Sequence, residues 1–114
     1  MTNDAPAIDP AVIETLREVM EDNFTLLLET YLADASERIE KLKPLQLSAD
    51  ADAIRKLAHS LKGSSSNLGA LHLAELCLRL EEKGRTGNLQ GIELDVAAIK
   101  TEFTRVNSVL RSYL

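Results

Sequence analysis

The chain is poor in the residues that build β-rich or disulfide-stapled proteins. Only 4% of its 114 residues are aromatic, tryptophan is absent, and there are three prolines and five glycines. Its one cysteine, Cys77, excludes an intramolecular disulfide and a zinc site of the multi-cysteine type. We therefore predict an all-α fold that forms one domain over residues 1–114, a length that can bury a core without disulfides.

Basic charge and long apolar runs are also scarce. The 13 lysines and arginines are outnumbered by 18 aspartates and glutamates, and a net charge of −5 argues against nucleic acid as the principal partner. No run approaches the roughly 18 apolar residues of a membrane span. Residues 1–4 lack the basic and apolar parts of a signal peptide. These absences predict a cytoplasmic protein that binds neither nucleic acid nor membranes, and a monomer is the simplest expectation.

Apolar residues recur every three to four positions along five segments, which is the spacing of amphipathic helices. The segments are residues 10–20, about 23–43, about 51–67, about 70–83 and about 89–110. The last four are long and are joined by short connections. They predict an up-down antiparallel four-helix bundle, with the short N-terminal helix as an accessory element.

Local signals predict where these helices begin and end. Asp9 is typical of an N-cap residue for the first helix. Pro44 is expected to end or kink the second helix, because proline lacks a backbone donor and disfavours helical geometry at the preceding residue. Either Ser48 or Asp50 can cap the third helix, and the glycine-rich run at residues 84–88 predicts a turn after the fourth.

One histidine, His59, is expected on the polar side of the third helix. At about 100° per residue, it lies about 140° from Ile54, which begins the apolar stripe. A neutral imidazole in water is a competent nucleophile, and Lys62 on the same face can stabilise negative charge on a phosphoryl group. Gly63 fills no hole in the core, so its missing side chain would let another protein approach the ring.

The motif around His59 resembles a known family. The run HSLKGSSSNLGA at residues 59–70 is similar to the core pattern of the histidine-containing phosphotransfer (HPt) family of two-component phosphorelays. That pattern is His-x-x-Lys-Gly, followed by small residues and then an apolar residue before glycine. The chain has no glycine-rich loop of the kind that cradles nucleotide phosphates, so it is not expected to charge its histidine from ATP.

This resemblance implies a four-helix bundle that carries a phosphoryl group on His59, normally at Nε2. It implies that Lys62 helps to hold the phosphoryl group and that Gly63 leaves room for a receiver domain. The chain would be a freestanding phosphocarrier and not an enzyme. It would accept the group from a phosphoaspartate on the receiver of a hybrid sensor kinase and pass it to the aspartate of a response-regulator receiver. No metal or cofactor is expected on the chain itself, and Mg²⁺ is expected on the partner receiver.

Several further residues are predicted to serve partner binding. The resemblance implies that a polar residue on the fourth helix hydrogen-bonds the histidine, and Glu81 is our candidate, with Arg85 one turn later as a phosphate contact. Leu71 and Leu78 fall outside the main apolar stripe, so they either cover the N-terminal helix or form an apolar docking patch. The complete set is Arg55, Lys56, Ser66, Leu71, Leu78, Glu81 and Arg85.

Two other classes of function compete with the phosphocarrier hypothesis. A noncatalytic helical adaptor would bind a kinase or regulator without carrying phosphate. A small hydrolase would use His59 as a general base, but the sequence offers no second catalytic residue at helical spacing. The phosphocarrier is the leading hypothesis because the motif and the helical outline both favour it.

Overall fold

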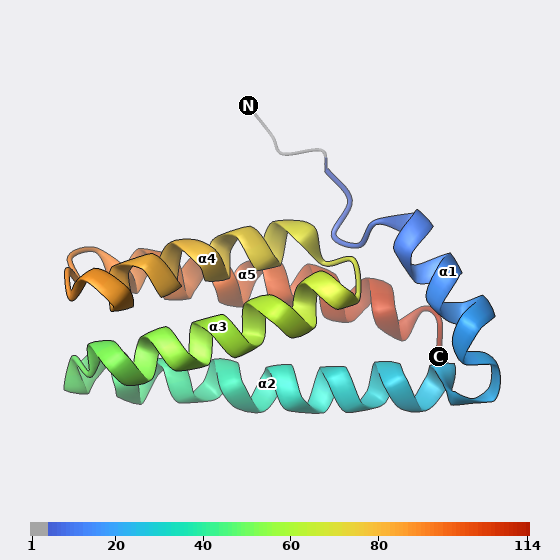
Figure 1. Ribbon diagram of the computed structural model, residues 1–114, viewed down its shortest axis with the longest axis horizontal. Helices are drawn as coiled ribbons and strands as arrows, with labels where there is room; N and C mark the ends of the chain where they lie inside the picture. Colours follow the sequence, from blue (N-terminus) through green and yellow to red (C-terminus); the bar gives the residue numbers. More distant parts are fainter. Residues whose placement is uncertain (1–4) are drawn as a thin grey trace.

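Helices make up nearly all of the computed structural model, which describes residues 5–114. They are α1 (Pro10–Met20), the short 3₁₀ turn η1 (Glu21–Asn23), α2 (Phe24–Ser48), α3 (Ala51–Asn67), α4 (Leu71–Thr86) and α5 (Ile92–Arg111). Helices α2 to α5 run lengthwise as a bundle, and α1 lies at one end of it (Figure 1). The predicted all-α, up-down four-helix bundle with an accessory N-terminal helix is confirmed. The prediction about a signal peptide rests on residues 1–4 and lies outside the described residues.

A single apolar cluster fills the space between the helices. Every bundle helix contributes fully buried side chains to it, and α1 adds Ile13. On α2 the buried positions recur at helical spacing and include Phe24, Leu28, Tyr31, Ala35, Ile39 and Leu42. Each large side chain of this kind contributes about 1.5–3 kcal/mol when it leaves water. In the described part of the chain, no helix is long and apolar enough to cross a membrane.

The sequence predicted that Pro44 would end or kink the second helix, and the first of these two alternatives is wrong. Helix α2 continues through Pro44 to Ser48, and Ala49 then closes it in the left-handed conformation with a φ of 53°. Proline removes only one helical hydrogen bond, and Leu45 on the next position packs against the core, so tertiary contact supports the last turn. Ser48 is therefore the final residue of α2, and Asp50 caps α3 by accepting a hydrogen bond from the Ala53 amide at 3.1 Å.

The turn predicted at residues 84–88 begins later than expected. Helix α4 runs on to Thr86, and Gly84 is a buried residue inside it. Gly87 ends the helix with a φ of 76°, and Gly91, also at 76°, precedes α5. Gly84 thus serves helix packing, whereas Gly87 and Gly91 supply the left-handed backbone that a turn requires.

Two polar residues lie deep in the bundle and are satisfied there. The hydroxyl groups of Tyr31 on α2 and Ser65 on α3 share a buried hydrogen bond of 2.8 Å. Burial raises the pKa of the Tyr31 phenol to about 12. Burial also raises the pKa of the Cys77 thiol to about 12, so Cys77 is a protonated core residue at neutral pH.

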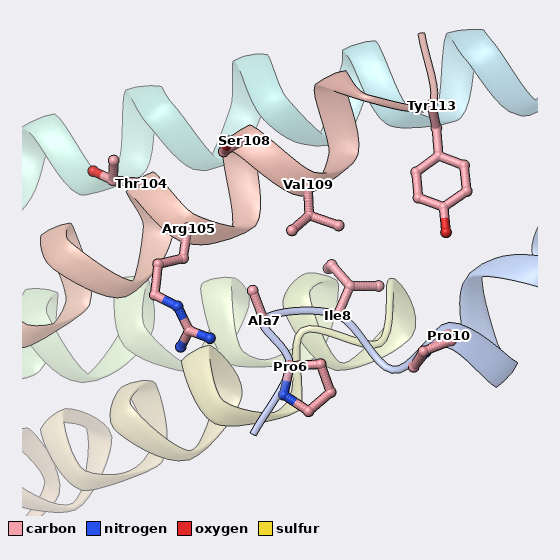
Figure 2. Close-up of a pocket in the computed structure, with 9 residues that line it drawn as sticks. All are labelled: Pro6, Ala7, Ile8, Pro10, Thr104, Arg105, Ser108, Val109 and Tyr113. Atoms are coloured by element: carbon pink, nitrogen blue, oxygen red, sulfur yellow. The ribbon is translucent and has the colours of Figure 1, made fainter. Parts of the chain in front are cut away.

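The segment before α1, residues 5–9, is held against the bundle, and we call it the strap. Asp9 caps α1 through the Ala11 amide, and its own amide donates to the Gly69 carbonyl at 2.8 Å. Figure 2 shows Ala7 and Ile8 of the strap pointing toward Val109 on α5, and both strap residues are buried. Arg105 on α5 donates to the Ala5 carbonyl at 2.8 Å. The strap therefore covers the α5 side of the bundle.

Candidate functional site

Helix α3 places its histidine at the surface because its other face is used for the core. Ile54, Ala58 and Leu61 are buried, whereas the His59 side chain is 65% exposed. The capped first turn and the packed stripe fix the rotation of the helix about its axis. His59 is therefore presented to solvent from a rigid support, which is what a nucleophile for another protein requires.

A carboxylate from the neighbouring helix connects His59 with Lys62. Glu81 on α4 lies with its Oε2 atom 2.9 Å from His59 Nδ1, and its Oε1 atom is 2.6 Å from Lys62 Nζ. The Glu81 side chain is only 15% exposed, because it lies between α3 and α4. The sequence analysis named these three side chains separately. They form one group on the α3–α4 surface, and we call His59, Lys62 and Glu81 the histidine group.

The ionisation of Glu81 fixes the tautomer of the histidine. The Lys62 ammonium lowers the pKa of the Glu81 carboxyl below its usual range, burial opposes this shift, and the hydrogen bond with His59 lowers it further. Glu81 is then a carboxylate at neutral pH and can only accept hydrogen bonds. His59 Nδ1 must carry the proton that it donates to Glu81, so the lone pair of the neutral ring lies on Nε2.

The surface next to this group is open. A Cβ atom added to Gly63 would meet no atom within 4 Å, so this residue keeps the surface low beside the histidine. A shallow groove between α3 and α4 begins at Lys62 and Gly63, and Ser66, Leu71 and Leu78 also line it. The side chains of Leu71 and Leu78 are exposed, as one of the two predicted alternatives requires.

The remaining predicted partner-binding residues hold surface ion pairs. Arg55 and Lys56 both contact Asp52 on their own helix, at 2.9 and 3.1 Å. Arg85 pairs with Glu82 one turn earlier on α4, at 2.7 Å. Within residues 5–114, the structure gives Arg85 no contact with the histidine group, and its role as a phosphate contact stays a prediction.

The sequence analysis did not foresee the ion pair between Lys62 and Glu81. The signal was available, because antiparallel helices that bring residue 59 next to residue 81 also bring the next turn, residue 62, within reach of the same carboxylate. It also missed Glu102, a charged residue that is buried on α5. No periodicity argument marks a glutamate as a core residue.

The family of this chain follows from its sequence. Residues 26–109, well over half of the chain, match the Hpt domain. The chain belongs to the Hpt domain family. The matched region contains His59, Lys62, Gly63 and Glu81, so the whole histidine group lies within the family domain.

Individual relatives agree with the family assignment. The phosphorelay protein LuxU of Vibrio harveyi is 30% identical over 77 residues, which are 68% of this Hpt chain and 68% of LuxU. The LuxU of Vibrio cholerae is 24% identical over 80 residues. The crystal structure of histidine-containing phosphotransfer protein B from Pseudomonas aeruginosa matches with 40% identity and a TM-score of 0.92, over 96% of both chains. The maize protein ZmHP2, at 21% identity, shares the fold with a TM-score of 0.83 over 94% of this chain and 88% of its own.

These findings establish the general activity of the chain. It is a histidine phosphotransfer carrier of phosphorelays and not an enzyme in its own right. In a phosphorelay, the partners of such a carrier are receiver domains.

Proposed function

We propose that His59 is the phosphoacceptor and that it reacts through Nε2. The observation that carries this proposal is the contact of Nδ1 with Glu81, which leaves Nε2 of a largely exposed ring as the free nucleophile. Within the described residues Nε2 has no hydrogen-bond partner. The phosphoryl group would come from a phosphoaspartate on one receiver domain and leave to the aspartate of another.

The transfer needs no proton to enter or leave His59. The Nε2 lone pair attacks phosphorus, the bond between phosphorus and the aspartate oxygen breaks, and the aspartate leaves as a carboxylate. The ring keeps its proton on Nδ1, and Glu81 stabilises the positive charge that the ring acquires. In the onward step an aspartate oxygen attacks phosphorus, and the bond to Nε2 breaks. The same arrangement therefore serves both directions.

Lys62 is suited to hold the phosphoryl group once it is on the histidine. It lies three residues after His59 on the same face of α3, and its side chain is 30% exposed. An ammonium group has three donors, so Lys62 can keep its ion pair with Glu81 while it donates to a phosphoryl oxygen. We assign most of the catalysis to the receiver, whose acidic pocket would hold Mg²⁺. The prediction that this chain binds no cofactor remains a prediction.

We assign receiver docking to the groove and open surface beside His59. Gly63 gives the partner backbone room, and the exposed Leu71 and Leu78 offer apolar contact next to it. Ser66 also lines this groove. Arg55, Lys56 and Arg85 would attract an acidic receiver pocket. We therefore favour the docking patch over the alternative in which the two leucines cover the N-terminal helix.

We further propose the identity of the partners and the setting in which the chain works. One receiver would belong to a hybrid sensor kinase and the other to a response regulator. The chain would act as a freestanding cytoplasmic monomer. Its match to histidine-containing phosphotransfer protein B, over 96% of both chains, supports the role as a carrier.

The decisive experiment compares the two histidines of the chain. Purified protein is mixed with a phosphorylated receiver, and phosphate uptake is followed by intact mass. The His59→Gln variant should take up no acid-labile, alkali-stable phosphate and should keep its helical circular dichroism, since His59 is exposed. The His72→Gln variant is the matched control and should be labelled like the wild type. Acid-labile phosphate on folded His59→Gln would refute the assignment, and a wild type that binds the receiver without labelling would favour the adaptor.

A further inference from the structure

Gly84 lies where α4 packs tightly against the backbone of α3. It is buried on α4, and a Cβ atom built there would lie 2.8 Å from the Ala51 carbonyl oxygen and 2.8 Å from the Arg55 amide nitrogen. The Arg55 Cα atom would be 3.0 Å away. All three are backbone atoms of the first two turns of α3, so no side-chain rotation can relieve the crowding. Any larger residue at this position must move one helix away from the other.

This glycine has no other structural reason to be there. Its backbone is helical, and glycine weakens a helix interior relative to alanine. Gly63 provides the contrast, because a Cβ added there meets nothing within 4 Å. The absence of a side chain at Gly84 is therefore used for contact between the two helices of this chain, whereas at Gly63 it faces open space.

The close approach lies one helical turn from the histidine group. Glu81 precedes Gly84 by three residues on α4, and Arg55 precedes His59 by four residues on α3, so each pair shares one helix face. Glu81 reaches both of its partners across this same interface, at 2.9 Å to His59 and 2.6 Å to Lys62. These distances leave little allowance for a wider separation of the helices.

We propose that Gly84 is a positioning residue, which sets the α3–α4 separation at which the Glu81 carboxylate holds His59 and Lys62 together. It acts through Glu81 and does not touch the phosphoryl group. The effect of Gly84 on the rate of phosphoryl transfer rests on the proposed function of His59. Its effect on which ring nitrogen of His59 carries the proton does not depend on any phosphate chemistry.

The first test reads the histidine ring directly. The chemical shifts of the two ring nitrogens of His59, measured by ¹⁵N NMR at neutral pH, report which nitrogen carries the proton. Gly84→Ala should move these shifts part of the way from the wild-type values toward those of Glu81→Ala, in which the acceptor is absent. Gly63→Ala makes the same chemical change on the same pair of helices in open space, and should leave the shifts unchanged. A folded Gly84→Ala protein with wild-type shifts would overturn the proposal, as would a variant that does not fold.

The second test is a double-mutant cycle on phosphate uptake from a receiver. Gly84→Ala should lower the initial rate about three- to tenfold, because a misplacement of about 1 Å can cost about a hundredfold and a methyl group displaces the helix by less. In the Glu81→Ala background the same change should cause no further loss. Equal losses in both backgrounds would show that Gly84 does not act through Glu81. If the wild type takes up no phosphate at His59, the proposed function fails while the ring shifts still decide the role of Gly84.

Discussion

Two glutamates of this bundle are shielded from solvent, and they hold different kinds of partner. The Glu81 side chain is 15% exposed and contacts His59 and Lys62, both of which come from the neighbouring helix. The Glu102 side chain is 5% exposed and pairs with Arg105, three residues later on its own helix, at 2.7 Å. Arg105 in turn donates to the strap, at Ala5.

The two carboxylates differ in the groups that surround them. Glu81 bridges two helices beside an exposed nucleophile, and one side of its surroundings is open at Gly63. Glu102 lies on the α5 side that the strap covers, and its Oε2 atom has no hydrogen-bond partner within residues 5–114. Burial of a carboxylate is thus no sign of function by itself. The partners of a buried carboxylate decide whether it has a functional role. Of these two glutamates, Glu81 has partners that phosphoryl chemistry can use.

The strongest test of this contrast is removal of the Glu81 carboxylate. Glu81→Ala should lower the rate of His59 phosphorylation about ten- to a hundredfold, since a hydrogen bond to a charged group contributes about 1.5–3 kcal/mol and also fixes the tautomer. Glu81→Gln keeps an acceptor but loses the charge, so its loss should be smaller. Rates come from intact mass over time. An unchanged rate in folded Glu81→Ala would remove the carboxylate from the mechanism.

The pH dependence of stability provides the control for this variant. The pKa of Glu81 is lowered in the folded chain, so its favourable interactions are present above the usual glutamate pKa of about 4.3 and are lost as the pH falls through the folded-state value. In urea unfolding, wild type should therefore exceed Glu81→Gln in stability at pH 6. The difference should shrink toward pH 3, and a constant difference would mean that the charge of Glu81 does not contribute.

A second prediction concerns the open side of the histidine group. Gly63→Leu should reduce transfer from a receiver about tenfold or more, because the added side chain projects into the space that the partner occupies. The fold should be retained, since nothing lies within 4 Å of the added Cβ atom and leucine favours helix over glycine. Thr101→Leu, at an exposed position on α5, is the control for an extra surface leucine. Wild-type transfer rates in Gly63→Leu would show that the partner needs no space at this position.

The same contrast explains how far the sequence could predict the structure. The helices, their apolar stripes and the exposed position of His59 follow from periodicity, because each depends on residues within a few positions of one another. The continuation of α2 past Pro44 and the burial of Gly84 do not, since both are decided by packing against another helix. A proline or glycine ends a helix only where no tertiary contact outweighs its local preference.

The sequence did not give the complete surroundings of either glutamate. The family resemblance pointed to Glu81, but its second partner Lys62 emerged only from the antiparallel alignment of α3 and α4. Glu102 is buried on α5, whereas the apolar Phe103 next to it is only partly buried. These two adjacent positions lie about 100° apart and flank the apolar stripe of α5 on opposite sides, so periodicity alone does not decide which of them is more deeply buried.

The weakest expected effects lie on the α5 side, and they concern stability alone. Arg105→Ala leaves the Glu102 carboxylate buried without its cation and removes the bond to Ala5, so it should lower the free energy of unfolding by about 2 kcal/mol. Glu102→Met replaces the carboxylate with an apolar group of similar size and leaves Arg105 free to be hydrated. It should change stability by less than about 1 kcal/mol.

Urea unfolding of both variants, together with phosphate uptake from a receiver, completes the comparison. Both should take up phosphate at the wild-type rate under conditions where they are fully folded, because Glu102 has no contact with the histidine group within the described residues. A slowed transfer in folded Arg105→Ala would mean that the strap side communicates with His59. The two glutamates would then belong to one connected system, and the separation between a reactive α3–α4 surface and a supporting α5 surface would no longer hold.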